Sequence, residues 1–127
     1  MYLDLLTKIK NGQASRKESV KLPYAEMDFV IAELLVKHKF AEAAFKKGRM
    51  PKRVLDVKLK YDADGRGAVQ GVKVLSRPSR RLYSGYADLR PVRQGYGLLV
   101  ISTPKGIMDG KSARKQKLGG QLLFEIW

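Results

Sequence analysis

The stretch LLVISTPKGIMDGKSARKQKLGG, residues 98–120, holds an apolar run, a glycine turn, a Gly-Lys-Ser tripeptide and a basic segment in that order. This order predicts a strand, a turn and a basic helix, and it raises the question of a phosphate-binding loop. A Walker loop needs a glycine, four residues and then Gly-Lys-Ser/Thr, because that length wraps backbone N–H groups around the phosphates. Here only three residues separate Gly106 from Gly110, and Asp109 would place a negative charge inside the loop. The spacing argues against a nucleotide site, and a nucleotide-dependent enzyme using residues 106–112 remains only an alternative.

The composition favours a folded protein with a polyanionic partner. The chain has 127 residues, 44% of them hydrophobic, which suits one compact domain or two small ones. Its 26 Lys and Arg against 12 Asp and Glu give a net charge of +14, which favours nucleic acid. With no cysteine and one histidine, His38, we expect no metal, no cofactor and no catalytic residues; the histidine should face solvent or cap a helix. The first ten residues do not follow the order of a signal peptide, so a cytoplasmic location is expected.

Hydrophobic periodicity in the first half predicts an α+β pattern of elements. A helix is expected over residues 2–12, with Asn11-Gly12 as its stop, and a second helix over residues 24–40. The apolar face of the second helix is expected to hold Met27, Val30, Ile31, Leu34 and Leu35. Strands are expected at residues 19–23, 40–47, 53–62 and 68–76, the last of them closing a small sheet.

The charge distribution and the local composition of the chain predict two domains. Residues 1–70 are expected to form a helix-strand-helix-strand-strand α/β domain, and residues 71–127 a mostly β domain with a short helix. From Arg77 the sequence is rich in Pro, Gly and Arg, typical of a loop-rich connection with short strands. The first 64 residues hold 14 basic and 9 acidic side chains, whereas the last 63 hold 12 and 3. We therefore expect the polyanion to contact mainly the second half.

Two further patterns have ordinary explanations beside their functional ones. The segment DADGRG, residues 62–67, resembles the start of a calcium loop, but the later ligands are missing. A β-turn explains it better, with Gly65 and Gly67 free to take positive φ. Four tyrosines lie among basic residues, as base-stacking aromatics do, and half of them are expected to pack in the core or hairpins instead. They are Tyr61, Tyr83, Tyr86 and Tyr96.

Three blocks of sequence together resemble one family. They are LTKIKNG at residues 6–12, SRPSRRLY at 76–83 and GYGLLVISTPKGIMDGKSARKQKLGGQ at 95–121. In this order and at these separations they resemble bacterial small-subunit ribosomal protein eight over nearly the whole chain. The resemblance implies a two-domain α/β protein without catalytic activity that binds a helical stem in the central domain of small-subunit ribosomal RNA. It also implies support of platform assembly and small-subunit proteins five and twelve as neighbours. An architectural DNA-binding protein remains a second alternative, separable by its indifference to the 2′-OH.

The resemblance also implies which residues approach RNA. The loop at Ser102, Thr103 and Pro104 is expected to enter the minor-groove side of an irregular RNA core, and Gln121 to help hold it. Lysines and arginines near this loop are expected to meet phosphates. The RNA-binding residues expected are Thr7, Lys8, Lys10, Asn11, Arg77, Arg80, Arg81, Tyr83, Ser102, Thr103, Pro104, Lys105, Gly106, Lys111, Arg114, Lys115, Gly119, Gly120 and Gln121.

The chain departs from the family pattern in several places. The family usually has a serine where Pro104 stands and a glutamate where Gln121 stands, and its SRPG is SRPS here, with Ser79. A proline offers neither a hydroxyl nor an N–H, so any hydrogen bond made there must be lost or replaced. The amino terminus is also shorter than the family pattern by a few residues, which affects contacts before Leu3.

Overall fold

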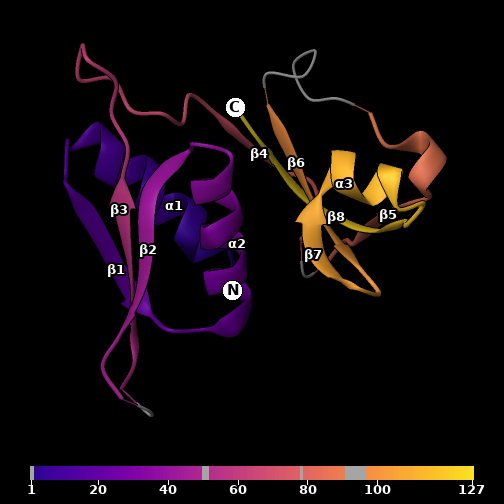
Figure 1. Ribbon diagram of the computed structural model, residues 1–127, viewed down its shortest axis with the longest axis horizontal. Coiled ribbons are helices and arrows are strands. Elements are labelled where there is room, and N and C mark those ends of the chain that lie inside the picture. The colour runs from indigo at the N-terminus through magenta and orange to yellow at the C-terminus, as the bar shows by residue number, and fades with distance from the viewer. Residues whose placement is uncertain (1, 50–51, 78, 91–96) are drawn as a thin grey trace. The chain divides into compact units, whose positions relative to one another are not determined.

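The computed structural model describes residues 2–49, 52–77, 79–90 and 97–127 of the chain (Figure 1). By their internal contacts the residues form two compact units, Met1–Val69 and Gln70–Trp127. The first unit combines helices with strands, and the second is mostly strand with one short α-helix. This mixture confirms the predicted α+β class.

The first unit is a three-stranded antiparallel sheet with two helices packed against it (Figure 1). Its elements are α1 (Tyr2–Ala14), β1 (Ser19–Pro23), α2 (Glu26–Lys37), β2 (Ala41–Lys47) and β3 (Val54–Leu59). The strand order is β1-β3-β2, so the last strand in sequence lies in the middle. The fully buried side chains of this unit come from both helices and from β3, and they include Leu5, Ile9, Ile31, Leu35, Leu55 and Val57. Burying these apolar side chains is what holds the helices on the sheet.

The prediction that Asn11-Gly12 ends the first helix is wrong, because α1 runs through both residues to Ala14. Gly12 is buried against the sheet. A Cβ at this position would lie 2.7 Å from Val20 Cγ1 and 3.0 Å from Leu59 Cδ1, which is too close for carbon atoms to fit without a shift. The glycine is therefore there to let α1 approach β1 and β3 closely, and its conformational freedom is not used.

Each of the helices α1, α2 and α3 (Gly110–Lys115) is followed closely by a basic residue in the left-handed conformation. The φ angles are 55° at Arg16, 67° at Lys39 and 57° at Lys117. A left-handed residue after the last turn is the common way to end a helix, and glycine usually occupies it. Since lysine and arginine do so here, a search for glycine or asparagine could not place these helix ends.

The buried face of α2 differs in part from the predicted one. Ile31 and Leu35 are fully buried as expected, but Met27 and Val30 are each 36% exposed. Asp28 lies on the buried side instead, with 3% of its surface exposed. Burial raises the pKa of the Asp28 carboxyl, and the nearby negative charge of Asp4 raises it further. Within the part of the chain that the structure describes, Asp28 Oδ1 makes no hydrogen bond.

We expect Asp28→Asn to stabilise the protein at pH 7 by about 1 kcal/mol, because burial disfavours the charged carboxylate and the neutral amide has no charge to desolvate. The carboxyl of the unfolded chain loses its proton near its ordinary pKa of 3.8, and the folded one does so at higher pH. The stability that the neutral folded carboxyl contributes is therefore present below pH 3.8 and is lost as pH rises through the folded pKa. Urea denaturation should show wild type and variant alike below pH 3.8 and separated at pH 7. An equal difference at both pH values would contradict this explanation.

Residues 62–67 form a turn, and the side chain of Asp62 closes it. Asp62 Oδ1 accepts the backbone N–H of Asp64 at 2.9 Å, as Asx turns do. Gly65 has a φ of 82°, which confirms the positive φ that was expected for it. Gly67 does not have positive φ, because its role is packing: a Cβ there would overlap the side-chain amide of Gln13. That amide bonds Val69 through both its oxygen and its nitrogen.

The second unit is a five-stranded antiparallel sheet with α3 packed on it (Figure 1). Its elements are β4 (Val72–Val74), β5 (Leu82–Ser84), the short 3-10 helix η1 (Tyr86–Asp88), β6 (Leu98–Thr103), β7 (Gly106–Asp109), α3 (Gly110–Lys115) and β8 (Gly120–Ile126). The strand order is β4-β8-β6-β7, and β5 also pairs with β8. Apolar side chains join α3 to the sheet, namely Leu89, Ile101 and Ala113 at the centre with Leu99, Met108 and Leu122 around them.

The segment at residues 68–76 does not close the first sheet as predicted. Its strand, β4, pairs with β8, with Val74 opposite Phe124. Gly71 explains part of this choice, since the Trp127 ring lies where a Cβ on Gly71 would be, at 2.6 Å. The Trp127 N–H also donates to the Gly71 carbonyl at 3.0 Å. The end of the chain therefore fixes where this strand pairs, and no local pattern carries that information.

Candidate nucleic-acid interface

A tight turn joins β6 to β7 at the centre of the predicted site. Thr103 and Gly106 face each other across it, and only Pro104 and Lys105 lie between them, both exposed. Proline presets the φ that the first turn position needs, and Gly106 takes a φ of 118° that other residues rarely adopt. The strand β7 itself was not predicted. Pro104, which replaces the family's serine, therefore has a structural reason in this chain: it stiffens the turn.

The Thr103 side chain holds this turn together. Its Oγ1 donates to the Gly106 carbonyl at 2.8 Å and accepts the Lys105 N–H at 3.2 Å. Only 8% of the Thr103 surface is exposed, whereas Ser102 beside it is half-buried. The two neighbouring hydroxyls thus differ, since one is already bonded within the turn and the other remains partly accessible.

The glycine pair Gly119 and Gly120, at the start of β8, allows very close contact between strands. A Cβ on Gly119 would lie 2.5 Å from the Ser84 carbonyl oxygen, and one on Gly120 would overlap the Ser102 carbonyl oxygen. Both neighbours are backbone atoms of paired strands, which cannot swing aside. The two glycines therefore let β8 lie against β5 on one side and β6 on the other, and they set the position of Gln121.

Three predicted residues that are far apart in sequence form one row across the sheet. Gln121 on β8 lies opposite Tyr83 on β5 and opposite Ser102 on β6. Residues in register across antiparallel strands share a face, so the three side chains point to the same side. Tyr83 is 68% exposed, and the other two are half-buried. We call these three residues the sheet row; it offers an aromatic ring, an amide and a hydroxyl in line.

The Gly-Lys-Ser tripeptide begins the short helix α3 and does not form a phosphate loop. Asp109 caps the helix, with its Oδ2 accepting the Ser112 N–H at 3.0 Å. The amide that a phosphate would need is therefore already bonded to a carboxylate. Gly110 serves packing, because a Cβ there would lie 2.8 Å from Leu99 Cδ2. The geometry agrees with the spacing argument against a nucleotide site.

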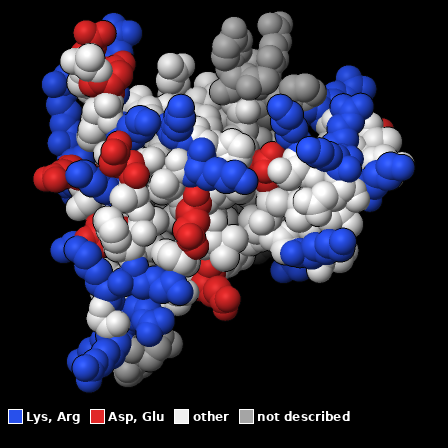
Figure 2. All heavy atoms as spheres, viewed as in Figure 1, with Lys and Arg blue, Asp and Glu red and all other residues white. Residues whose placement is uncertain are grey.

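Basic side chains surround the turn and α3. Lys105, Lys111 and Lys115 are exposed, and Figure 2 shows Lys and Arg over much of the visible face of this unit. Arg114 is also exposed, but its Nη1 donates to the Leu89 carbonyl at 3.4 Å, so it also links α3 to the residue after η1. Asp109, used as a helix cap, is the one acidic residue between Leu98 and Gln121. The region is well suited to attract phosphates.

The three arginines near residue 80 lie on a second tight turn of this unit. Arg77 and Arg80 exchange backbone hydrogen bonds of 2.8 and 3.0 Å, and all three, with Arg81, are exposed. Ser76, which is buried, anchors the turn by accepting the Leu82 N–H at 2.9 Å. This role of Ser76 was not predicted, although a serine before Arg-Pro is a usual turn signal.

The four predicted residues of α1 belong to the first unit. Thr7 donates its hydroxyl to the Leu3 carbonyl at 2.9 Å, and Lys8 Nζ donates to the Lys21 carbonyl at 2.8 Å. Both side chains thus have partners within the protein, while Lys10 and Asn11 are exposed. An ammonium group has three donors, so Lys8 can still bind a further acceptor.

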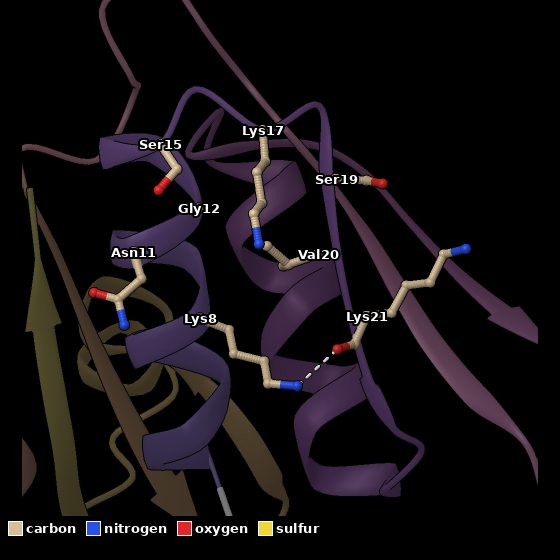
Figure 3. Close-up of a pocket in the computed structure, with 8 residues that line it drawn as sticks. All are labelled: Lys8, Asn11, Gly12, Ser15, Lys17, Ser19, Val20 and Lys21. Atoms are coloured by element: carbon tan, nitrogen blue, oxygen red, sulfur yellow. Dashed lines mark hydrogen bonds between the residues drawn. The ribbon is translucent and has the colours of Figure 1, made fainter.

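A groove of about 480 Å³ lies between α1 and β1 (Figure 3). Lys8 and Asn11 line it from α1, and Ser15, which directly follows the helix, lines it too; the three are spaced three and four residues apart. Lys17 points into the space between helix and strand, whereas the Lys21 ammonium points away. Ser15 and Lys17 were not predicted as site residues. Helical spacing from Lys8 would have found Ser15 if the helix had not been ended at Gly12.

The remaining candidates have structural explanations. The Tyr61 hydroxyl donates to the Lys17 carbonyl at 2.5 Å, Tyr86 is 42% exposed, and Tyr96 lies outside the described residues. His38 caps α2, its backbone N–H donating to the Leu34 carbonyl at 3.1 Å, as expected. Among residues 2–49, 52–77, 79–90 and 97–127 no group of His, Asp or Glu is placed to hold a metal ion. No helix in this same part is long and apolar enough to cross a membrane.

Comparison with known proteins agrees with this picture. Residues 2–127 match the family model described as ribosomal protein S8. The small ribosomal subunit protein uS8 of Bdellovibrio bacteriovorus is 42% identical over 123 residues, covering 96% of this chain and 95% of the relative. The proteins of the same name from Rhizorhabdus wittichii and Roseiflexus castenholzii are 37% and 36% identical, each over 98% of this chain and 94% of the relative. The chain therefore belongs to the ribosomal protein S8 family and is a structural, non-enzymatic protein of the small ribosomal subunit.

Proposed function

We propose that the chain is a primary RNA-binding protein that binds a helical stem in the central domain of the small-subunit ribosomal RNA. In this role it supports assembly of the subunit platform, on the ribosome in the cytoplasm. The observation that carries the proposal is the sheet row of Tyr83, Gln121 and Ser102, which lies beside the stiff turn at residues 103–106. We further propose that residues 71–127 form the RNA-recognition domain.

The sheet row suits the shape of an A-form RNA stem. The minor groove of such a stem is wide and shallow, and it displays 2′-hydroxyls and base edges that short polar side chains can reach. The Ser102 hydroxyl and the Gln121 amide both donate and accept hydrogen bonds. The exposed ring of Tyr83 can stack on a base that leaves the helix at an irregular pair. Gln121, in place of the family's glutamate, adds a donor and removes a negative charge that phosphates would repel.

The basic side chains supply attraction without sequence preference. Each lysine or arginine that meets a phosphate releases counterions, which makes binding weaken as salt rises. Lys105, Lys111 and Lys115 are exposed near the turn, and we propose them as phosphate contacts together with Arg77, Arg80, Arg81 and Arg114. In the first unit we propose a second phosphate contact at the groove of Lys8, Asn11 and Lys17, next to Thr7 and Lys10.

The protein neighbours rest on family resemblance alone. We propose small-subunit proteins five and twelve, and chemical crosslinking of assembled subunits followed by mass spectrometry would identify them. Crosslinks to other proteins only would overturn this assignment.

The test of RNA recognition is a specificity ratio. We expect the full-length protein to bind a stem-loop from the central domain about 10³ times more tightly than a stem-loop of the same composition with its irregular pairs scrambled, at about 0.15 M salt. Duplex DNA of the matching sequence should not compete, because it lacks the 2′-hydroxyl. Fluorescence anisotropy with labelled stems measures both. Equal affinity for the two stems, or displacement by the DNA, would overturn the proposal.

A further inference from the structure

A second basic surface lies at the free end of the β2–β3 hairpin, and none of its residues is among those proposed above for RNA binding. We call it the hairpin arm, and it consists of Phe45, Lys46, Lys47, Gly48, Arg49, Lys52 and Arg53. Between Glu42 and Asp56 the chain has five basic residues and no acidic one. Figure 2 shows these basic side chains gathered at the end of the hairpin seen in Figure 1. The density of like charge there exceeds what the protein itself neutralises.

Most of this charge has no counter-charge among the residues that the structure describes. Asp56 pairs with Lys47 at 2.8 Å and is itself 5% exposed. The other four cations of the arm form no ion pair within the residues that the structure describes. Like charges held close together on a short hairpin repel one another, which costs stability in the free protein. A polyanionic ligand would relieve that repulsion.

Aromatic rings hold two of these cations in place. Lys46 Nζ lies 4.6 Å from the centre of the Phe29 ring, and the Arg53 guanidinium lies 5.5 Å from the centre of the Tyr24 ring. The two rings contact each other at a centroid distance of 6.0 Å. The Tyr24 N–H also donates to the Arg53 carbonyl at 3.0 Å. These contacts order the base of the arm, so less side-chain freedom is lost when it binds a ligand.

Backbone contacts link Gly48, Arg49 and Lys52 near the end of the arm. Gly48 has a φ of 87°, which other residues rarely adopt, and the Lys52 N–H donates to the Arg49 carbonyl at 2.9 Å. A Cβ on Gly48 would lie 3.2 Å from the Lys52 carbonyl oxygen. The exposed residues Arg49 and Lys52 are therefore joined by a backbone hydrogen bond.

The exposed ring of Phe45 indicates which kind of polyanion the hairpin arm binds. Its side chain is 49% exposed, on the strand position directly opposite Asp56, and Lys47 Nζ lies 6.0 Å from the centre of its ring. An exposed aromatic ring bordered by cations is the arrangement that binds single-stranded nucleic acid, with a base on the ring and phosphates on the cations. A regularly base-paired stem keeps its bases stacked and cannot use the ring, whereas every base of a single strand is open to it.

We propose that the hairpin arm binds a single-stranded segment of RNA, with Phe45 stacked on one base and Arg49 and Lys52 on its phosphates. The proposal rests on the proposed function in one respect, that the natural partner is ribosomal RNA. The contact differs from the stem contact in position and in the form of RNA that it selects.

The test uses full-length protein and a fluorescein-labelled oligouridine of about ten nucleotides, since one base on one ring and a few phosphates need no longer strand. Phe45→Ala should weaken binding about tenfold, the effect usual for one stacked base. Phe45→Trp should retain binding and Phe45→Leu should not, because stacking needs a π-face. Val30→Ala, an equally surface-placed apolar change on α2, is the matched control and should leave binding unchanged. Arg49→Gln with Lys52→Gln should reduce the slope of log affinity against log salt by up to about 1.4, at about 0.7 for each phosphate contact to a single strand.

The outcomes separate this proposal from the proposed function. Ser102→Ala should weaken the specific stem and leave oligouridine binding unchanged, whereas Phe45→Ala should do the opposite. If the specific stem is not bound but oligouridine binding still depends on Phe45, the arm stands without the stem contact. The proposal for the hairpin arm would be overturned if Phe45→Ala and Phe45→Leu both bound oligouridine as tightly as wild type and showed unchanged thermal unfolding. Tighter binding of an oligoglutamate peptide than of oligouridine would also overturn it, in favour of an acidic protein partner.

Discussion

Gly120→Ala should destabilise the protein by about 3 kcal/mol, among the larger effects that one substitution has. The added Cβ would overlap the Ser102 carbonyl oxygen and lie 2.9 Å from its carbonyl carbon and 3.1 Å from Thr103 Cα. These are backbone atoms within the β6–β8 ladder, so the strands must separate for the methyl group to fit. The hydrogen bonds that fix Gln121 opposite Ser102 would be lost with that separation. Urea denaturation measures the change in the free energy of unfolding.

Gly85→Ala is the matched control in the same unit. A Cβ on Gly85 meets nothing within 4 Å, and its φ of −74° suits any residue. Alanine there should leave the free energy of unfolding unchanged or slightly higher, because it restricts the unfolded chain. If both alanine variants unfold like wild type, the close approach of β8 to β6 is not a real constraint on the sequence.

Thr103→Val should lower the free energy of unfolding by about 2 kcal/mol and weaken binding of the specific stem together with it. Valine keeps the shape but removes the hydroxyl that bonds both the Gly106 carbonyl and the Lys105 N–H. The turn would then lose both of these hydrogen bonds, which contribute about 1 kcal/mol each. Thr103→Ser, which keeps the hydroxyl, should largely preserve stability and binding. Denaturation and anisotropy on the same three proteins give both quantities.

This expectation assigns Thr103 a different role from the one that the resemblance implies. A threonine in a recognition loop is naturally expected to give its hydroxyl to RNA. The structure gives that hydroxyl to the turn, so we expect the effect on RNA binding to follow from the shape of residues 103–106. A valine variant as stable as wild type that still binds the stem poorly would instead mean a direct contact of the hydroxyl with RNA.

The elements that were predicted well are those with strong local signals. The strand at residues 19–23 and the alternating strand that begins at Val54 are present, since their residues alternate and their ends carry turn signals. The features that were predicted wrongly depend on residues distant in sequence. Gly12 looked like a helix stop, and only the presence of Val20 and Leu59 above it shows why a glycine is needed there. The pairing of β4 with β8 depends on where residue 127 lies.

In the candidate site, too, single residues could be predicted from the sequence, whereas their arrangement could not. Resemblance named Tyr83, Ser102 and Gln121 as separate residues, and the register of three strands brings them into one row. No sequence pattern could show that Thr103 is bonded within its turn while Ser102 is not. The hairpin arm was not predicted at all, because Phe45 was expected to be an ordinary strand residue and its exposure depends on which face of the sheet the helices cover.

The most direct measurement is the salt dependence of stem binding for two variants that separate recognition from attraction. Ser102→Ala should weaken the specific stem about tenfold, as one lost buried hydrogen bond does, with the slope of log affinity against log salt unchanged. Lys115→Gln should weaken the specific and scrambled stems alike and reduce the slope by up to about 1. Lys115 is preferred to Arg114, which also bonds the Leu89 carbonyl. A reduced slope for Ser102→Ala together with lost specificity for Lys115→Gln would contradict the assignment of recognition to the sheet row and attraction to α3.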